Sequence, residues 1–165
     1  MLPSGSVDYE IELVAVIGRF TERVRASAAW RHVAGLMIGQ DLSDRVVQMR
    51  PPAPQFSLGK SFPGFGPTGP WLVSPDEFDD PDDLALTCKL NGEVVQASRT
   101  SDLIFSVGEI IERVSAITPM LPGDLVFTGT PAGVGIGRTP PLFLAADDVL
   151  ESTIEGIGTI VTTLR

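Results

Sequence analysis

Strand-like patterns dominate the hydrophobic and polar positions of this chain. Residues 9–20, YEIELVAVIGRF, are rich in β-branched residues and alternate at their start, which predicts a strand. Residues 84–98 read as two strands around Asn91-Gly92, a dipeptide typical of tight hairpins. The segments 124–130 and 148–165 supply the remaining strands. We therefore expect sheets to form most of the fold.

Helical patterns are fewer. Residues 27–37, SAAWRHVAGLM, carry apolar residues at helical spacing and predict a helix that runs into a strand. Residues 106–117 predict a second helix, with Ser106 and Glu109 at capping-box spacing. Residues 50–70 contain too much proline and glycine for regular structure and predict a long loop. Together these patterns predict one mainly β or α+β domain over residues 1–165.

Length and charge narrow the class of protein. A chain of 165 residues suits one domain, and its net charge of −9 argues against a nucleic-acid partner. No apolar run approaches the roughly 20 residues that span a bilayer, so we expect no membrane association. The N-terminal residues lack a secretory signal, and the single cysteine, Cys88, cannot form an internal disulfide. These features favour a cytoplasmic protein with Cys88 packed as a small hydrophobic residue.

The segment 121–141, LPGDLVFTGTPAGVGIGRTPP, concentrates glycine and proline. It does not fit a phosphate-binding P-loop, because Gly137 is followed by Arg138-Thr139 rather than by Lys and Ser or Thr. It does not fit a dinucleotide fingerprint either, because two prolines follow where a helix would begin. The segment is therefore either a plain chain reversal or the wall of another kind of site.

Three acidic residues suggest a metal centre. Glu10 and Glu12 lie two apart on a predicted strand and should share one face, where they repel each other unless a cation lies between them. Asp41 follows at the end of an apolar segment. Three oxygen ligands suit a hard cation such as Mg²⁺, with Mn²⁺ or Ca²⁺ as alternatives. The alternative explanation is ordinary polar alternation on a half-exposed strand.

Eight stretches together resemble the C-terminal catalytic domain of the fumarylacetoacetate hydrolase family. They occur in the family's order over nearly the whole chain and read DYEIELVAVIG, VAGLMIGQDLSDRVVQ, GKSF, GPTGPWLV, LNGEVVQ, TSDLIFSVGEII, LPGDLVFTGTPAGVG and IEGIGTI. The resemblance implies a mixed β-roll-like fold with a few short helices, and a homodimer. It also implies a divalent metal at Glu10, Glu12 and Asp41.

The same resemblance implies roles for further residues. Arg45 and Lys60 would act as catalytic cations, and the substrate would be contacted by Gln48, Gly129 and Thr130. The substrate would be a 2-oxo or 1,3-dicarbonyl acid, undergoing C–C hydrolysis, decarboxylation or tautomerisation through a metal-stabilised enolate. For Arg45 and Gln48 the sequence leaves a second interpretation open, a solvated helix face. The segment 121–141 would then be a wall of the substrate pocket, where Gly129 and Gly133 permit close backbone approach.

Some features depart from the family pattern. Family members usually carry a preceding segment whose lid supplies a His–Glu pair that activates water, and this sequence shows no such pair. Its one histidine, His32, lies in the predicted helix and is more typical of a packed residue than of a base. Pro63 stands where aspartate is common, and Gln40 where asparagine is common. We therefore expect tautomerisation to be favoured over hydrolysis; the alternative is a catalytically impaired subunit that binds a metal or small molecule.

Overall fold

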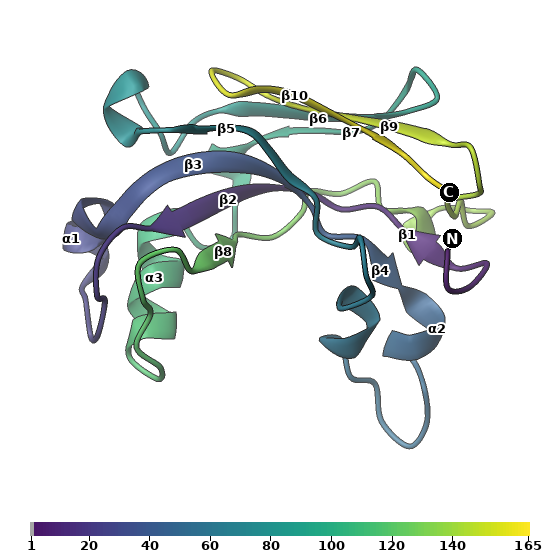
Figure 1. Ribbon diagram of the computed structural model, residues 1–165, viewed down its shortest axis with the longest axis horizontal. Helices are drawn as coiled ribbons and strands as arrows, with labels where there is room; N and C mark the ends of the chain where they lie inside the picture. The colour runs from purple at the N-terminus through teal and green to yellow at the C-terminus, as the bar shows by residue number, and fades with distance from the viewer. Residues whose placement is uncertain (1) are drawn as a thin grey trace.

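Two four-stranded antiparallel sheets form the body of the computed structural model, which describes residues 2–165 (Figure 1). The first sheet has the strand order β5-β3-β2-β8. Its strands are β2 (Ile11–Ile17), β3 (Val33–Gln40), β5 (Thr68–Val73) and β8 (Leu125–Phe127). The second sheet has the order β10-β9-β6-β7 and consists of β6 (Ala85–Leu90), β7 (Glu93–Arg99), β9 (Val149–Ile154) and β10 (Gly158–Thr163).

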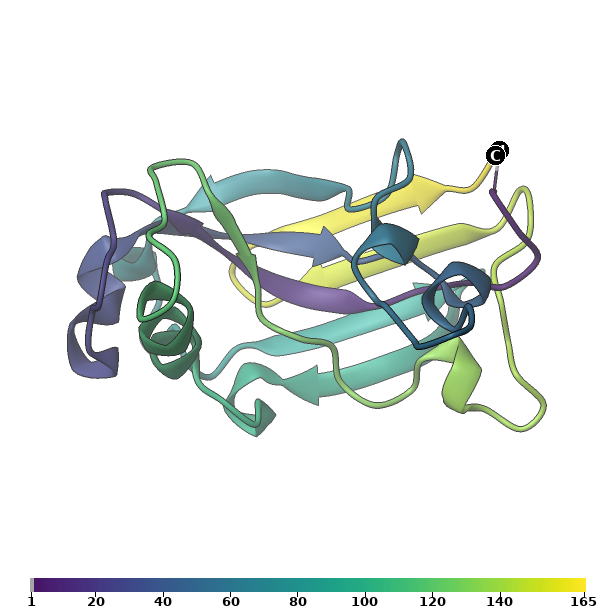
Figure 2. The ribbon, with the colours of Figure 1, turned by 90° about the horizontal axis from the view of Figure 1, so that it is seen from below.

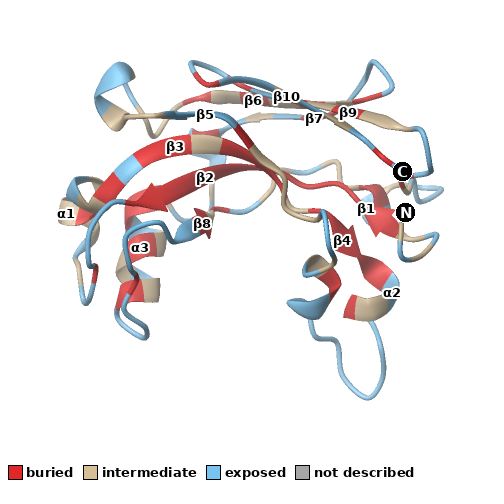
Figure 3. Cartoon of the chain, in the orientation of Figure 1, coloured by how far each residue is buried: buried red, intermediate tan, exposed pale blue. Residues whose placement is uncertain are grey.

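The hydrophobic core lies between the two sheets. In β6 and β9 burial alternates along the strand, so one face of the second sheet covers the core and the other meets solvent. In contrast, all seven residues of β2 are buried, which makes it the most enclosed strand of the two four-stranded sheets (Figure 3). Leu13 of β2, Leu86 of β6 and Leu150 of β9 belong to one cluster of buried side chains. Any polar side chain on β2 is therefore also enclosed.

Short elements complete the fold. They are the pair β1 (Val7–Asp8) and β4 (Ser43–Asp44), the helices α1 (Ala26–Ala29), α2 (Arg45–Gln48) and α3 (Val107–Ser115), and the 3-10 turns η1 (Trp30–His32), η2 (Leu58–Lys60), η3 (Pro75–Glu77), η4 (Thr100–Asp102) and η5 (Gly135–Gly137). Figure 1 shows α3 and α2 below the first sheet at opposite ends, and Figure 2, seen from below, shows them in front of it. No helix among the described residues is long and apolar enough to cross a bilayer.

Most predicted elements are present. The mainly β fold is confirmed, and β6 and β7 form the expected hairpin, with Asn91 and Gly92 both at positive φ. The helix α3 begins with the expected capping box, in which the Ser106 side chain accepts from the Glu109 N–H and the Glu109 carboxylate accepts from Ser106. The predicted loop 50–70 contains only η2 and the first three residues of β5.

The segment 27–37 is a helix that runs into a strand, as predicted, and the change falls after His32. Helical structure ends there, and β3 begins at Val33 and pairs with β2 along its length. Its apolar residues are buried from both sides by tertiary packing, which overrides the helical spacing. Gly35 and Gly39 let neighbouring side chains pack directly on the backbone of β3. A Cβ atom at Gly35 would meet Leu72, and one at Gly39 would meet Phe127 and Val14. His32 is a packed residue as expected, with its Nδ1 2.8 Å from the Thr21 hydroxyl.

Candidate metal centre and active site

Three carboxylates converge where β2 and β3 run side by side. Glu10 immediately precedes β2, Glu12 lies within it, and Asp41 immediately follows β3. Antiparallel pairing sets Ile11 opposite Gln40, and the Asp41 N–H donates to the Glu10 carbonyl at 2.9 Å. One oxygen from each of the three carboxylates lies within 4.8 Å of the others. The pairing of two strands therefore brings Asp41 to the two glutamates, from which it is separated by 29 residues or more in the sequence.

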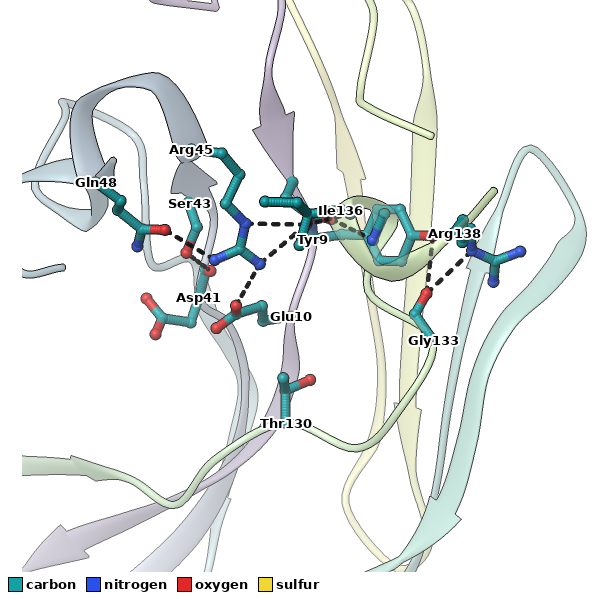
Figure 4. A network of polar contacts seen from close by, with 12 residues as sticks. Tyr9, Glu10, Asp41, Ser43, Arg45, Gln48, Thr130, Gly133, Ile136 and Arg138 are labelled. Atoms are coloured by element: carbon teal, nitrogen blue, oxygen red, sulfur yellow. Dashed lines mark hydrogen bonds and ion pairs between the residues drawn. The ribbon is translucent and has the colours of Figure 1, made fainter. Parts of the chain in front are cut away.

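Arg45 provides the first positive charge at this cluster. Its guanidinium donates to Glu10 at 2.6 Å, to Asp8 at 3.0 Å and to the Gln48 side-chain oxygen at 2.9 Å (Figure 4). Burial lowers the Arg45 pKa, but its bonds to Glu10 and Asp8 outweigh that effect and raise it. Arg45 and Gln48 are both buried, so the interpretation of a solvated helix face is wrong.

The helix α2 that carries Arg45 and Gln48 is a single turn. Asp44 caps it by accepting a hydrogen bond from the Val47 N–H at 3.0 Å. Positions 45 and 48 lie three apart, so both side chains project from one face of the turn toward the carboxylates. A short, capped turn thus suffices to aim both side chains.

Lys60 provides the second positive charge. Its ammonium donates to Glu10 at 2.8 Å and also to Asp41. Burial lowers the Lys60 pKa, but the two carboxylates more than offset this and raise it. The preceding Gly59 packs directly on Gln48, whose Cγ would lie 2.5 Å from an added Cβ. The glycine of the GKSF stretch therefore lets the loop approach closely enough for Lys60 to reach the acids.

Glu12 differs from its neighbours because no cationic side chain among the described residues forms an ion pair with it. It is 3% exposed and accepts a hydrogen bond from the Gly129 N–H at 2.7 Å. Burial raises the Glu12 pKa to about 8 despite that bond, and burial also raises the Asp41 pKa. An enclosed set of carboxylate oxygens with uncompensated negative charge fits a hard divalent cation.

The Thr128–Ala132 segment runs along the edge of β2 beyond the end of β8. Thr128 donates to the Leu13 carbonyl and Thr130 to the Ile11 carbonyl, each at 2.9 Å. Gly129 has a φ of 102°, a conformation that favours glycine, and this directs its N–H to Glu12. Gly133 is required for a different reason, because an added Cβ would collide with the Val95 carbonyl.

A cavity of about 470 Å³ lies behind this segment. It is lined by Leu13, Leu86, the Thr128–Ala132 segment and the stretch from η4 to α3. Leu13 and Glu12 are successive residues of a strand and face opposite sides of the sheet. The Thr128–Ala132 segment therefore separates the cavity from the carboxylates, and none of the three acids lines it.

Two buried polar residues at the site were missed by the sequence reasoning. Asp8 is fully buried, bonds Arg45 and accepts from the Gly135 N–H at 2.6 Å and the Ile136 N–H at 2.9 Å. Its place two residues before Glu10 continues the spacing of Glu10 and Glu12, and that signal was available. Gln96 bonds Thr130 and the backbone of Ile11, and its place at the end of the LNGEVVQ stretch of the family resemblance was an available signal.

Known proteins share this architecture and sequence. The family model for the C-terminal domain of fumarylacetoacetate hydrolase matches residues 1–165. The chain belongs to the fumarylacetoacetate hydrolase family. It is 43% identical over 158 residues to human oxaloacetate tautomerase FAHD2A, mitochondrial, an alignment that covers 96% of this chain and 50% of the relative. The chain thus spans about half the length of the curated relatives it matches.

Solved structures agree with this assignment. A crystal structure of a Mycobacterium smegmatis protein that is assigned provisionally to HpcE has a TM-score of 0.96 and 53% identity, covering 99% of this chain and 60% of that one. Fumarylpyruvate hydrolase from Pseudomonas aeruginosa, solved with Mn²⁺ and pyruvate, has a TM-score of 0.89 and 33% identity, covering 99% and 68%. The predicted family and fold are confirmed.

The structure brings most of the predicted site residues together. The three acids, Arg45, Lys60 and Gln48 form one connected group, and Gly129 joins it through Glu12. Thr130 stands apart in one respect: its hydroxyl donates to the Ile11 carbonyl and accepts from Gln96. Its predicted contact with a substrate stays a prediction, as do the other individual roles.

Proposed function

We propose that this chain is the catalytic domain of a divalent-metal-dependent enzyme that interconverts the enol and keto forms of a 2-oxo or 1,3-dicarbonyl acid. The observation that carries the proposal is Glu12, a buried carboxylate beside Glu10 and Asp41 that lacks a cationic partner. The names of related proteins support the reaction class, since they include an oxaloacetate tautomerase and a fumarylpyruvate hydrolase.

Glu10, Glu12 and Asp41 are the residues that would hold the metal. Their oxygen donors suit Mg²⁺ or Mn²⁺, and Ca²⁺ is a further possibility among hard cations. When bound, the metal supplies Lewis-acid charge that lowers the energy of an enolate. The Mn²⁺ in the fumarylpyruvate hydrolase structure is consistent with this choice of ion.

The chain's own residues would bind the acid and move a proton. Arg45 and Lys60 place fixed positive charge beside the carboxylates, where an anionic substrate and its enolate need stabilisation. In the enol-to-keto direction the enol oxygen loses a proton to water, C3 gains one from a protonated side chain, and that side chain regains its proton from water. Lys60 is the candidate donor, because Glu10 and Asp41 keep its ammonium protonated. The Gln48 amide would orient the substrate's oxygens.

We favour tautomerisation over C–C hydrolysis or decarboxylation. Hydrolysis requires a base to activate water, which typically contributes about 10²–10⁴-fold to rate. The imidazole of His32 bonds Thr21 and belongs to η1 rather than to the carboxylate cluster, and the relative named as an oxaloacetate tautomerase supports the choice of reaction. Tautomerisation moves a proton between carbon and oxygen without attack by water, so it does not need a base that activates water.

Proton exchange provides the test of the reaction. We expect the protein with Mg²⁺ or Mn²⁺ to accelerate exchange of the C3 protons of oxaloacetate in D₂O, followed by proton NMR, with slow cleavage. The control is the same metal without protein, because the free ion itself promotes enolisation. Exchange no faster than in that control would contradict the proposal, and metal binding without acceleration would favour a binding subunit instead.

Metal binding is tested separately from activity. Calorimetric titration should show one Mg²⁺ or Mn²⁺ site that Glu12→Ala abolishes. A matched control is Glu93→Ala, an exposed acid at the start of β7 that should leave binding unchanged. Equal binding by wild type and Glu12→Ala would remove the three carboxylates from the proposal.

We also propose a homodimer. The described chain leaves several large apolar side chains in solvent, among them Ile104 at 92% exposure and Ile117 at 89%. Exposed apolar surface of this kind is typical of association sites. Light scattering at micromolar concentration should give twice the chain mass of 17.6 kDa. A mass of one chain would contradict the proposal.

A further inference from the structure

Gln96 joins three parts of the candidate site from the opposite sheet. It lies on β7, an edge strand of the second sheet, and is 2% exposed. Its side-chain oxygen accepts from the Ile11 N–H at 3.1 Å, and its Nε2 donates to the Thr130 hydroxyl at 2.8 Å and the Pro131 carbonyl at 3.0 Å. Both N–H donors and the oxygen of the amide are therefore used.

The position of Ile11 gives these bonds their significance. Ile11 lies between Glu10 and Glu12, so the orientation of its two peptide groups sets where both carboxylates point. On one side β2 pairs with β3 from Ile11 onward, but on the other side β8 pairs only with Val14–Val16. Side chains therefore replace strand pairing along the edge of β2 at Ile11.

The replacement forms a closed ring. Gln96 binds the Ile11 N–H, Thr130 binds the Ile11 carbonyl at 2.9 Å, and Gln96 binds Thr130. Each member of the ring holds the other two, so displacement of one moves the backbone between the two acids relative to the Thr128–Ala132 segment. We propose that Gln96 is a positioning residue, which sets the geometry between the metal-binding acids and the segment that bears Gly129 and Thr130.

A glutamine suits this place better than residues of similar shape. Glutamate would set a carboxylate against the Pro131 carbonyl, where no donor faces it, and methionine would leave the Ile11 N–H and the Pro131 carbonyl without their partner. Gln40 makes an instructive comparison. It accepts from the Glu10 N–H at 2.9 Å, but its Nε2 donates to Ser152 and Cys88 inside the core. Gln40 anchors one acid to the core, whereas Gln96 links the acids to a wall of the site.

The test uses Mn²⁺ affinity measured without substrate, and it depends on the proposed metal centre. We expect Gln96→Met to weaken Mn²⁺ binding about ten-fold, within the 10- to 100-fold range typical of residues that orient metal ligands. Ser98→Ala is the matched control, because Ser98 lies two residues along β7 and its hydroxyl donates to the exposed Asp102. It should leave the affinity unchanged. Circular dichroism and thermal unfolding identify the folded fraction of each variant.

Thr130→Val provides a second variant that opens the same ring from the half-buried Thr128–Ala132 segment, should Gln96→Met fail to fold. We expect it also to weaken Mn²⁺ binding in the absence of substrate. The double variant should bind Mn²⁺ about as tightly as either single variant, because the two residues act as one unit. A Thr130 that only contacts substrate would leave Mn²⁺ affinity unchanged, and that result would overturn the ring.

The two proposals fail in distinguishable ways. Mn²⁺ binding that Glu12→Ala abolishes and that folded Gln96→Met leaves within two-fold of wild type would overturn the role of Gln96 alone. Absence of Mn²⁺ binding by the wild-type chain would overturn the metal centre and the positioning role together.

Discussion

The two sides of β2 bury very different side chains within a few ångströms. Toward the second sheet, Ile11 and Leu13 join the hydrophobic core with at most 1% exposure. On the other side, Glu10 and Glu12 are 8% and 3% exposed, so they are nearly as enclosed. Burial favours the apolar side by removing hydrocarbon from water, whereas it disfavours the acidic side unless charges are paired.

The acidic side is compensated unevenly. Glu10 is paired with both Arg45 and Lys60, and Asp41 with Lys60. Glu12 accepts a hydrogen bond from the Gly129 N–H but has no ion pair among the described residues, and burial of its carboxylate raises its pKa to about 8. The fold therefore stabilises β2 by burying apolar side chains on one face, while the carboxylates buried on the other face need positive charge beside them. Removing a compensating charge should therefore cost as much as removing core hydrocarbon.

Arg45→Met should have the largest effect on stability. It keeps much of the side chain's length but leaves Glu10 and the fully buried Asp8 without their shared cation. Breaking a buried ion pair typically costs about 3–5 kcal/mol. Urea unfolding of the metal-free protein measures this change. A loss below about 1 kcal/mol would show that water compensates these acids and would weaken the comparison.

Leu13→Ala tests the apolar side at an adjacent position. Loss of a buried leucine typically costs about 2–5 kcal/mol, and the existing cavity beside Leu13 should place this variant toward the lower end. Because Leu13 faces away from the acids, the folded variant should keep wild-type affinity for Mn²⁺. Unfolding in urea and a Mn²⁺ titration on the same preparation measure both quantities. A large fall in affinity would mean that the two sides of β2 are not independent.

Glu12→Gln should change how stability depends on pH in the metal-free protein. The folded-state pKa of Glu12 is raised from 4.5 to about 8, so the folded state holds its proton more tightly than the unfolded state. Stability should therefore fall as pH rises from about 4.5 to about 8, by on the order of 2 kcal/mol after relaxation around the charge. Glu12→Gln should remove that part of the fall. Parallel pH profiles for both proteins, measured with EDTA present, would contradict this.

Arg99→Met should have the smallest effect. Arg99 forms ion pairs with Asp83 and Glu155, but all three side chains are substantially exposed. Exposed pairs gain little from each other because water already solvates them. We expect the melting temperature to stay within the repeat error of a thermal scan. A loss similar to that of Arg45→Met would show that enclosure is not what separates the two arginines.

Local signals in the sequence predicted much of the fold. The Asn91-Gly92 turn and the Ser106–Glu109 capping box each specify their geometry within four residues, and both formed as expected. The segment 27–37 changes from helix to strand as predicted, but the residue at which it changes could not be predicted, because a short apolar run fits a buried helix or a buried strand equally well. The strand conformation of residues 33–37 is decided by β2 and β5 on either side of them, which no local pattern contains.

The candidate site divides in the same way. Strand spacing predicted that Glu10 and Glu12 share a face, and the family resemblance pointed to these acids, Asp41, Arg45 and Lys60 as one site. The burial of Arg45 could not be predicted, because it follows from Asp8 and Glu10 across 35 residues or more. Gln96 is the clearest case: its partners lie 85 and 34 residues away and meet only in the folded chain.

One edge of β2 binds partners that lie far along the chain, and this separation affects the order in which contacts form during folding. β2 pairs with β3 soon after it in the chain, but its other edge waits for β8 and for Gly129, which is 117 residues distant from Glu12. Contacts between such distant residues form slowly, because closing a long loop costs entropy before the contact repays it. The Glu12 environment is therefore completed only when the last third of the chain has docked. A metal ion that requires this environment would distinguish fully folded molecules from partly folded ones during refolding.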